Sequence, residues 1–175
     1  MFSFCFLLKF ATQNIIIMEN TKILFVCLGN ICRSASAEAV MKHLVDKVGI
    51  AHLFEIDSAG IIGYHAGEQA DPRMRRHAAN RGINITSISR KITADDFEYF
   101  DMIIGMDDDN IDKLLRLAKS NTERKKISKM TDYCQIYNNN SVPDPYYGGD
   151  KDFELVLDLL DDACNGLLKS IYKDE

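Results

Sequence analysis

The sequence predicts a single α/β domain of three layers, in which helices cover both faces of a four-stranded, parallel, twisted sheet. Short apolar runs alternate along the chain with longer segments whose apolar residues recur at helical spacing. The chain has 175 residues, of which 46% are hydrophobic. This is enough for one core and leaves no length for a second domain.

The first elements form a strand, a loop and a helix. Residues 22–26 (KILFV) are an uninterrupted apolar run, which is typical of a buried strand. Residues 34–48 are expected to form a helix that Gly49 ends. The apolar face of this helix is expected to hold Ala37, Val40, Met41, Leu44 and Val48.

A second strand over residues 54–57 is expected to lead into the tripeptide Ser-Ala-Gly at 58–60. Asp71 and Pro72 predict the start of another helix, because proline suits the first helical position, and Gly82 predicts its end.

The second half repeats the alternation. Residues 101–106 predict a third strand and residues 107–118 a helix, whereas residues 126–130 predict a weaker fourth strand. Residues 138–150 (NNNSVPDPYYGGD) are dense in turn-forming residues and predict a long surface loop, which is often functional. Residues 153–171 predict the last helix, with one core-facing stripe.

The net charge and the cysteine content reduce the number of function classes to consider. The formal net charge is -5 and the pI about 5.4, which argues against nucleic acid as a partner, so that any anion site must be local. The five cysteines are odd in number and unevenly spread, which favours reduced thiols in a cytoplasmic protein.

Residues 1–17 are apolar but make a poor signal peptide. No charge precedes the apolar run, Lys9 interrupts it, and it is shorter than the roughly 20 apolar residues that span a bilayer. We expect the native protein to start at Met18, with residues 18–175 as the domain and no stable membrane association. A short membrane-associating or export segment is the open alternative.

The loop between the first strand and the first helix carries the chemistry. Amide groups and the helix dipole at a helix N-terminus bind anions, and Gly29 is expected to permit the tight loop. Cys27 would then meet a bound phosphate as a thiolate nucleophile. Arg33 supplies a planar fork for two phosphoryl oxygens, and the hydroxyl of Ser34 is suited to capping the helix. Cysteine six positions before arginine is a weak pattern alone, but this context makes it specific.

The segment VCLGNICRS at residues 26–34 resembles the signature of the low molecular weight protein tyrosine phosphatase family. Ser-Ala-Gly at 58–60, GEQADPR at 67–73, residues 92–110 and Asp-Pro-Tyr-Tyr at 144–147 follow in the order and spacing of that family. The resemblance covers residues 18–172.

The resemblance implies a hydrolase that removes phosphate from phosphotyrosine in proteins, and from small aryl phosphates, without metal or cofactor. Cys27 would form a phosphocysteine intermediate, Arg33 would stabilise the transferred phosphoryl group, and Asp144 would be the general acid and base. A phosphotyrosine protein is the implied substrate, and a tyrosine kinase is a candidate partner.

The resemblance also implies roles for neighbouring residues. The phosphate-binding loop is implied to comprise Leu28, Gly29, Asn30, Ile31, Cys32 and Ser34, supported by hydrogen bonds of Asn30, Ser34 and Ser58. The substrate cleft is implied to include Ile31, Tyr64, Tyr146 and Tyr147, and Cys32 to be a redox partner able to form a disulfide with Cys27.

Several positions depart from the family pattern, and those near the substrate cleft bear on substrate preference. Ala35 replaces a usual proline, Tyr64 stands where many relatives have tryptophan, and Ile88 or Ser89 stands near a frequent histidine. Ile31 follows the tyrosine phosphatases, since the arginine-phosphate phosphatases of this fold resemble one another in having threonine there.

Two other functions stay open. A thiol-dependent arsenate reductase of this fold would need a closely spaced cysteine pair, whereas Cys134 and Cys164 are far apart. An inactive phosphotyrosine-binding module would not need both Cys27 and Asp144.

Overall fold

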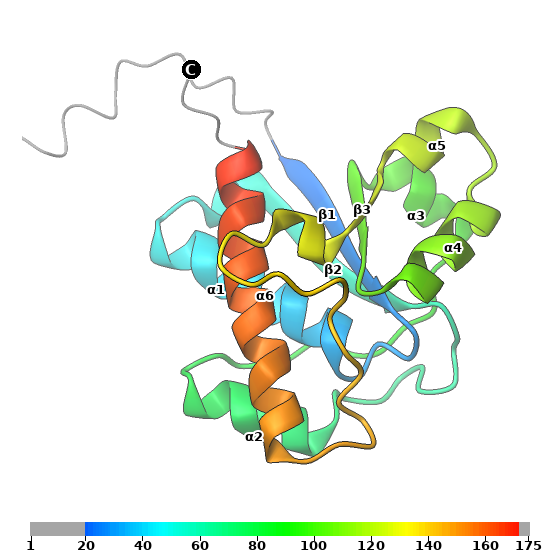
Figure 1. Ribbon diagram of the computed structural model, residues 1–175. Helices are drawn as coiled ribbons and strands as arrows, with labels where there is room; N and C mark the ends of the chain where they lie inside the picture. The colour runs from blue at the N-terminus through cyan, green and yellow to red at the C-terminus, as the bar shows by residue number, and fades with distance from the viewer. Residues whose placement is uncertain (1–19, 172–175) are drawn as a thin grey trace, which may run out of the picture.

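The computed structural model describes residues 20–171, which form a parallel sheet with helices on both faces (Figure 1). The expectation about residues 1–17 concerns a segment outside the described residues. The strand order is β2-β1-β3-β4, and all three pairings are parallel. The strands are β1 (Thr21–Cys27), β2 (Phe54–Gly60), β3 (Met102–Gly105) and β4 (Ile127–Lys129).

The helices lie in two layers, one on each side of the sheet (Figure 1). No helix within residues 20–171 combines the length and the apolar character that crossing a membrane requires. The α-helices are α1 (Arg33–Lys47), α2 (Pro72–Asn80), α3 (Ala94–Tyr99), α4 (Asp108–Leu117), α5 (Asn121–Lys125) and α6 (Asp150–Ile171), with short 3-10 helices η2 (Ala51–Leu53) and η3 (Met130–Tyr133).

Alternate side chains of β1 enter two separate cores. Ile23 and Phe25 are fully buried on the face that α1 and α6 cover. Leu24 and Val26 are fully buried on the other face, in the core that contains Phe97 of α3. A strand buried on both faces must be apolar throughout, which is why β1 reads as a continuous apolar run. The predicted fold class is therefore confirmed.

The structure corrects the prediction for α1. Val48 was expected on the apolar face but is 54% exposed, because the helix ends at Lys47. The first half of α1 is instead buried all round, including the charged side chains of Arg33 and Glu38. Buried charges need partners, and both of these residues contribute to the site described below.

The buried carboxylate of Asp162 in α6 is expected to contribute strongly to the stability of the fold. Its carboxylate accepts hydrogen bonds from the backbone N–H groups of Gln135, Ile136 and Tyr137, at 2.9 to 3.0 Å. Burial alone would raise the pKa of Asp162, but these N–H groups outweigh it and lower the pKa.

We therefore expect Asp162→Asn to lower the free energy of unfolding by about 1–3 kcal/mol near neutral pH, since an amide turns one N–H toward those donors. A group whose folded pKa is lowered stabilises above its unfolded pKa, and this contribution is lost as the pH falls through the folded value. The difference from wild type should therefore shrink below about pH 4. Urea titrations at several pH values measure it, with the exposed neighbour change Asp161→Asn as control. Equal stability of the two variants would contradict this account.

Candidate active site

The loop that joins β1 to α1 lies at the carboxyl edge of the sheet, where the N-terminus of α1 also lies. Its course is held by backbone hydrogen bonds from Ile61 N to Cys27 O (2.9 Å) and from Ile62 N to Leu28 O (3.0 Å). Gly60 permits this close approach, because a Cβ atom there would lie 3.0 Å from Leu28 O and 2.9 Å from Ile62 O. Parallel sheets commonly bind ligands at this edge.

The sulfur of Cys27 sits inside this loop and is 3% exposed as a residue. The backbone N–H of Asn30 donates to Cys27 Sγ at 3.3 Å, and Ser34 Oγ lies 3.0 Å from the same sulfur. These contacts and the N-terminus of α1 would stabilise an anionic sulfur. Ser34 does not cap the helix, contrary to the sequence prediction, because its hydroxyl contacts Cys27, Asn30 and the carbonyl of Ala59.

Asn30 fixes the shape of the loop. Its φ of 58° places it in the left-handed region, so the tight turn falls here and not at Gly29 as the sequence suggested. Its Nδ2 donates to Ser34 Oγ and to Ser58 Oγ, both at 2.9 Å, and its Oδ1 accepts from the backbone N–H of Arg90 at 3.0 Å. All three hydrogen bonds are buried or half-buried, so the side chain is held in one orientation.

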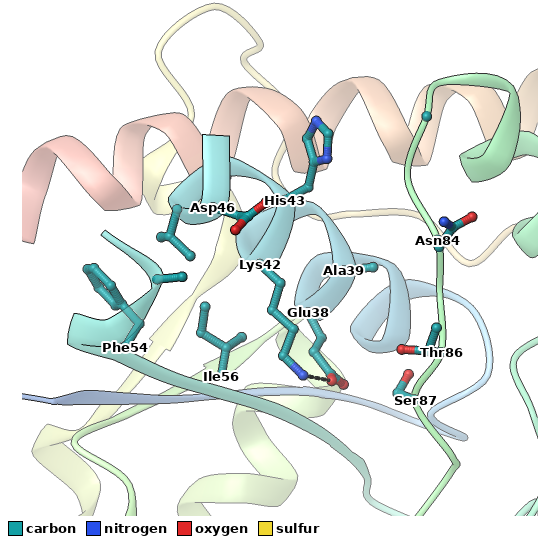
Figure 2. Close-up of a pocket in the computed structure, with 13 residues that line it drawn as sticks. Glu38, Ala39, Lys42, His43, Asp46, Phe54, Ile56, Asn84, Thr86 and Ser87 are labelled. Atoms are coloured by element: carbon teal, nitrogen blue, oxygen red, sulfur yellow. Dashed lines mark hydrogen bonds and ion pairs between the residues drawn. The ribbon is translucent and has the colours of Figure 1, made fainter. Parts of the chain in front are cut away.

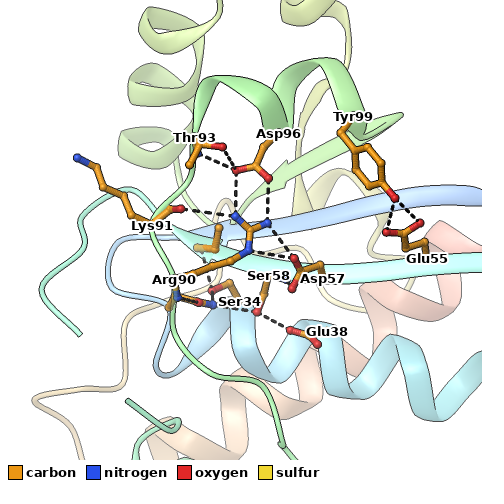
Figure 3. A network of polar contacts seen from close by, with 12 residues as sticks. Ser34, Glu38, Glu55, Asp57, Ser58, Arg90, Lys91, Thr93, Asp96 and Tyr99 are labelled. Atoms are coloured by element: carbon orange, nitrogen blue, oxygen red, sulfur yellow. Dashed lines mark hydrogen bonds and ion pairs between the residues drawn. The ribbon is translucent and has the colours of Figure 1, made fainter. Parts of the chain in front are cut away.

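The residues that support Asn30 from behind were not predicted from the sequence. Ser58 Oγ donates in turn to Glu38 Oε2 at 2.5 Å (Figure 3). The guanidinium of Arg90 lies between the carboxylates of Asp57 and Asp96, which it meets at 2.8 and 2.9 Å. These partners come from α1, β2 and the start of α3, so no local spacing could have revealed them.

Arg33 is the buried cation of the site, with 3% of the residue exposed. Its Nη1 donates to the carboxylate of Asp107 and to Val142 O, and its Nη2 donates to Asp144 Oδ2 at 3.0 Å. Burial alone would lower the pKa of Arg33, but Cys27 and the two carboxylates outweigh it and raise the pKa. Asp107 lies two residues after the end of β3, and a carboxylate shortly after a strand beside β1 is the signal that could have identified it.

Asp144 lies on the loop before α6, with 46% of its side chain exposed. Its Oδ1 accepts from the backbone N–H of Tyr146 at 3.2 Å, which fixes the local turn. Val142 N donates to Met106 O at 2.8 Å and so ties the loop to the end of β3. The structure therefore brings Asp144 next to Arg33, although 111 positions separate them in sequence.

The three tyrosines of the predicted cleft are exposed to different degrees. Tyr146 is 37% exposed, Tyr147 97% and Tyr64 82%. The rings of Tyr146 and Tyr147 meet edge-on, with centroids 5.0 Å apart. Arg73 donates to Tyr146 O at 3.0 Å, which holds the start of this aromatic pair against α2. The exposed rings of Tyr146 and Tyr147 follow Asp144 in the chain, and exposed rings there can receive a flat aryl group.

Cys32 is buried, and its thiol is free like those of Cys27, Cys134 and Cys164. Burial raises the pKa of Cys32, and the charges of Asp71, Cys27 and Asp144 raise it further. The Cys32 thiol is thus held neutral, and its disulfide with Cys27 stays a prediction. Among residues 20–171, no three His, Cys, Asp or Glu side chains are grouped so that they could hold a metal ion.

The sequence resembles those of known proteins over most of its length. Residues 22–175 match the family model described as low molecular weight phosphotyrosine protein phosphatase. A curated protein of that name from Schizosaccharomyces pombe is 39% identical over 154 residues, which are 87% of this chain and 98% of the relative.

Two solved structures are similar in fold. The crystal structure of a protein tyrosine phosphatase from Entamoeba histolytica, with Hepes in the active site, superposes with a TM-score of 0.83 at 48% identity, covering 85% of this chain and 94% of that one. The crystal structure of a Drosophila arginine phosphatase also gives a TM-score of 0.83, at 30% identity, covering 89% of this chain and all of the other.

Proposed function

The chain belongs to the low molecular weight phosphotyrosine protein phosphatase family, and from this premise we propose that it hydrolyses phosphotyrosine in proteins through a phosphocysteine on Cys27. One observation carries the proposal. A buried sulfur, a buried guanidinium and an exposed carboxylate converge on one loop at the N-terminus of α1.

In the first step, the phosphate binds in the loop, where backbone N–H groups and the fork of Arg33 contact its oxygens. The Cys27 thiolate attacks phosphorus in line, an S–P bond forms, and the P–O bond to the tyrosine breaks. Asp144, as the carboxylic acid, gives its proton to the departing phenolate. Its exposed position at the mouth of the loop suits this role.

In the second step, the Asp144 carboxylate takes a proton from water as that water attacks the phosphocysteine. The S–P bond breaks, inorganic phosphate leaves, and the thiolate and the protonated acid are restored. Asn30, Ser34 and Ser58 keep the loop open through the hydrogen bonds described above, so that amide N–H groups point at the phosphoryl oxygens.

Phosphotyrosine is the substrate that the site favours over phosphoarginine, although one structural relative is an arginine phosphatase. Tyr146, Tyr147 and Tyr64 supply exposed aromatic surface for a phenyl ring, whereas Ile31 is buried against the core and supplies little surface in this structure.

The test compares matched phosphotyrosine and phosphoarginine peptides in EDTA. We expect kcat/KM to be at least about tenfold higher for phosphotyrosine. Preference for phosphoarginine would overturn the substrate assignment, and failure of well-folded protein to hydrolyse either peptide would overturn the reaction.

Asp107 is proposed to position Arg33 during both steps. We expect Asp107→Asn to lower kcat for para-nitrophenyl phosphate by about 10- to 100-fold, since the charged hydrogen bond that holds the guanidinium is weakened. The neighbouring change Asp108→Asn removes an exposed carboxylate that pairs only with Lys129 among the described residues, and is expected to leave kcat within about twofold of wild type. A kcat for Asp107→Asn equal to that of Asp108→Asn would contradict the role.

A further inference from the structure

A cavity lies between α1, β2 and residues 82–87, and Cys27 is not among the residues that line it. Its volume is about 520 Å³, which suits a small organic molecule. Figure 2 shows the Glu38 carboxylate with Thr86 and Ser87 to one side of it and Phe54 and Ile56 to the other. The cavity therefore has a polar end and an apolar end.

Two side chains at the polar end, those of Glu38 and Ser87, could form hydrogen bonds with a ligand. Glu38 is 5% exposed, and its Oε1 accepts from Nζ of Lys42 at 2.5 Å. The Lys42 side chain is 52% exposed, so it can leave this contact for water. Ser87 Oγ is buried and has no hydrogen-bond partner among the described residues. A buried hydroxyl without a partner is unfavourable, and a ligand that bonds to it removes that penalty.

We propose that this cavity binds a small organic ammonium compound with an apolar or aromatic body. The ammonium group takes the place of Lys42 at Glu38 Oε1. The Ser87 side chain turns about its Cα–Cβ bond toward the ligand, and its Oγ accepts a second hydrogen bond. The apolar body packs toward Phe54 and Ile56. Lys42 and His43 also line the cavity. Once Lys42 has turned into water, the carboxylates of Glu38 and Asp46 remain and would repel negative charge, so a cation is favoured over an anion.

The cavity is connected to the phosphate-binding loop by hydrogen bonds. Glu38 accepts a hydrogen bond from Ser58 (Figure 3). Ser58 accepts from Asn30, and Asn30 also donates to Ser34, whose Oγ lies beside the sulfur of Cys27. A ligand that holds Glu38 in place therefore favours the loop conformation that binds phosphate. By linkage, phosphate in the loop must raise the affinity for the ammonium compound by the same factor. This coupling rests on the proposed function, whereas binding to the cavity does not.

The test titrates phenethylammonium into the isotope-labelled full chain and follows the amide resonances. We expect saturable shifts at residues that line the cavity, and binding at least about tenfold weaker for phenethyl alcohol, which lacks the charge. Saturating inorganic phosphate should preserve these shifts and tighten binding at least about twofold. Shifts confined to the loop at 27–34, or no saturable shifts, would overturn the site, and equal affinity with and without phosphate would overturn the coupling.

Variants of the residues that line the cavity test whether the ammonium compound binds there. Glu38→Gln should weaken binding at least about tenfold and Ser87→Ala about fivefold, whereas Lys42→Met should tighten it, because a competing ammonium group is removed. Lys47→Met is the charge-matched control outside the cavity and should leave the affinity unchanged.

Ala51 is exposed and lines the cavity, so Ala51→Trp should fill it and abolish binding without touching the hydrogen-bond chain. His52→Trp places the same side chain on the neighbouring residue, which does not line the cavity, and should bind like wild type. Equal affinities of Glu38→Gln, Ala51→Trp and wild type would overturn the proposal.

Discussion

Replacing Cys27 with serine is expected to lower turnover of para-nitrophenyl phosphate and of a phosphotyrosine peptide by about 10⁴-fold or more. The hydroxyl nearly matches the thiol in size and can keep the contacts to Asn30 N and Ser34 Oγ. It is not ionised at neutral pH, however, and cannot form the S–P bond. Phosphate binding should survive, since the amide groups and Arg33 are unchanged. Steady-state rates and phosphate affinity together test this separation.

Cys134→Ser is the matched control, because Cys134 is a half-buried thiol whose sulfur contacts Leu159 O in α6. We expect its rate to stay within about twofold of wild type. If Cys27→Ser retained more than about a hundredth of wild-type turnover, another group would be the nucleophile.

The second large effect is expected at Asp144. Asp144→Asn keeps the shape that contacts Arg33 Nη2 and the backbone N–H of Tyr146, but it can neither give nor take a proton. We expect kcat for a phosphotyrosine peptide to fall by about 10²- to 10⁴-fold. The fall should be smaller for para-nitrophenyl phosphate, because its leaving group is a weaker base and needs less protonation.

Asp150→Asn removes an exposed carboxylate from the first residue of α6, where this loop ends, and should leave both rates within about twofold of wild type. A fall at Asp144→Asn that is the same for both substrates would contradict the role as acid toward the leaving group.

The parts of this account that the sequence could predict are those encoded locally. β1 is an apolar run because it is buried on both faces, and Cys27, Asn30 and Arg33 are close in space because they share one loop. Asp144 was predictable only through its family resemblance, since its contact with Arg33 spans 111 positions.

The supporting residues were not predictable in the same way. Glu38 lies on a helix whose spacing suggests an exposed glutamate, and only packing reveals that it is buried and bonded to Ser58. Arg90 donates a hydrogen bond to Asp57, which is 33 positions away, so its role cannot be read from local spacing. The helices α3 and α5 escaped prediction because six and five residues are too few to show helical periodicity.

The central claim is that catalysis passes through a covalent phosphate on Cys27, and trapping that intermediate tests it most directly. Protein mixed with a phosphotyrosine peptide in EDTA would be quenched in acid within milliseconds, digested, and examined by mass spectrometry. The account predicts one added phosphoryl group on the peptide that contains Cys27, and none in the Cys27→Ser variant. Rapid turnover with the phosphoryl group on another residue, or with wild-type rates in the Cys27→Ser variant, would contradict it.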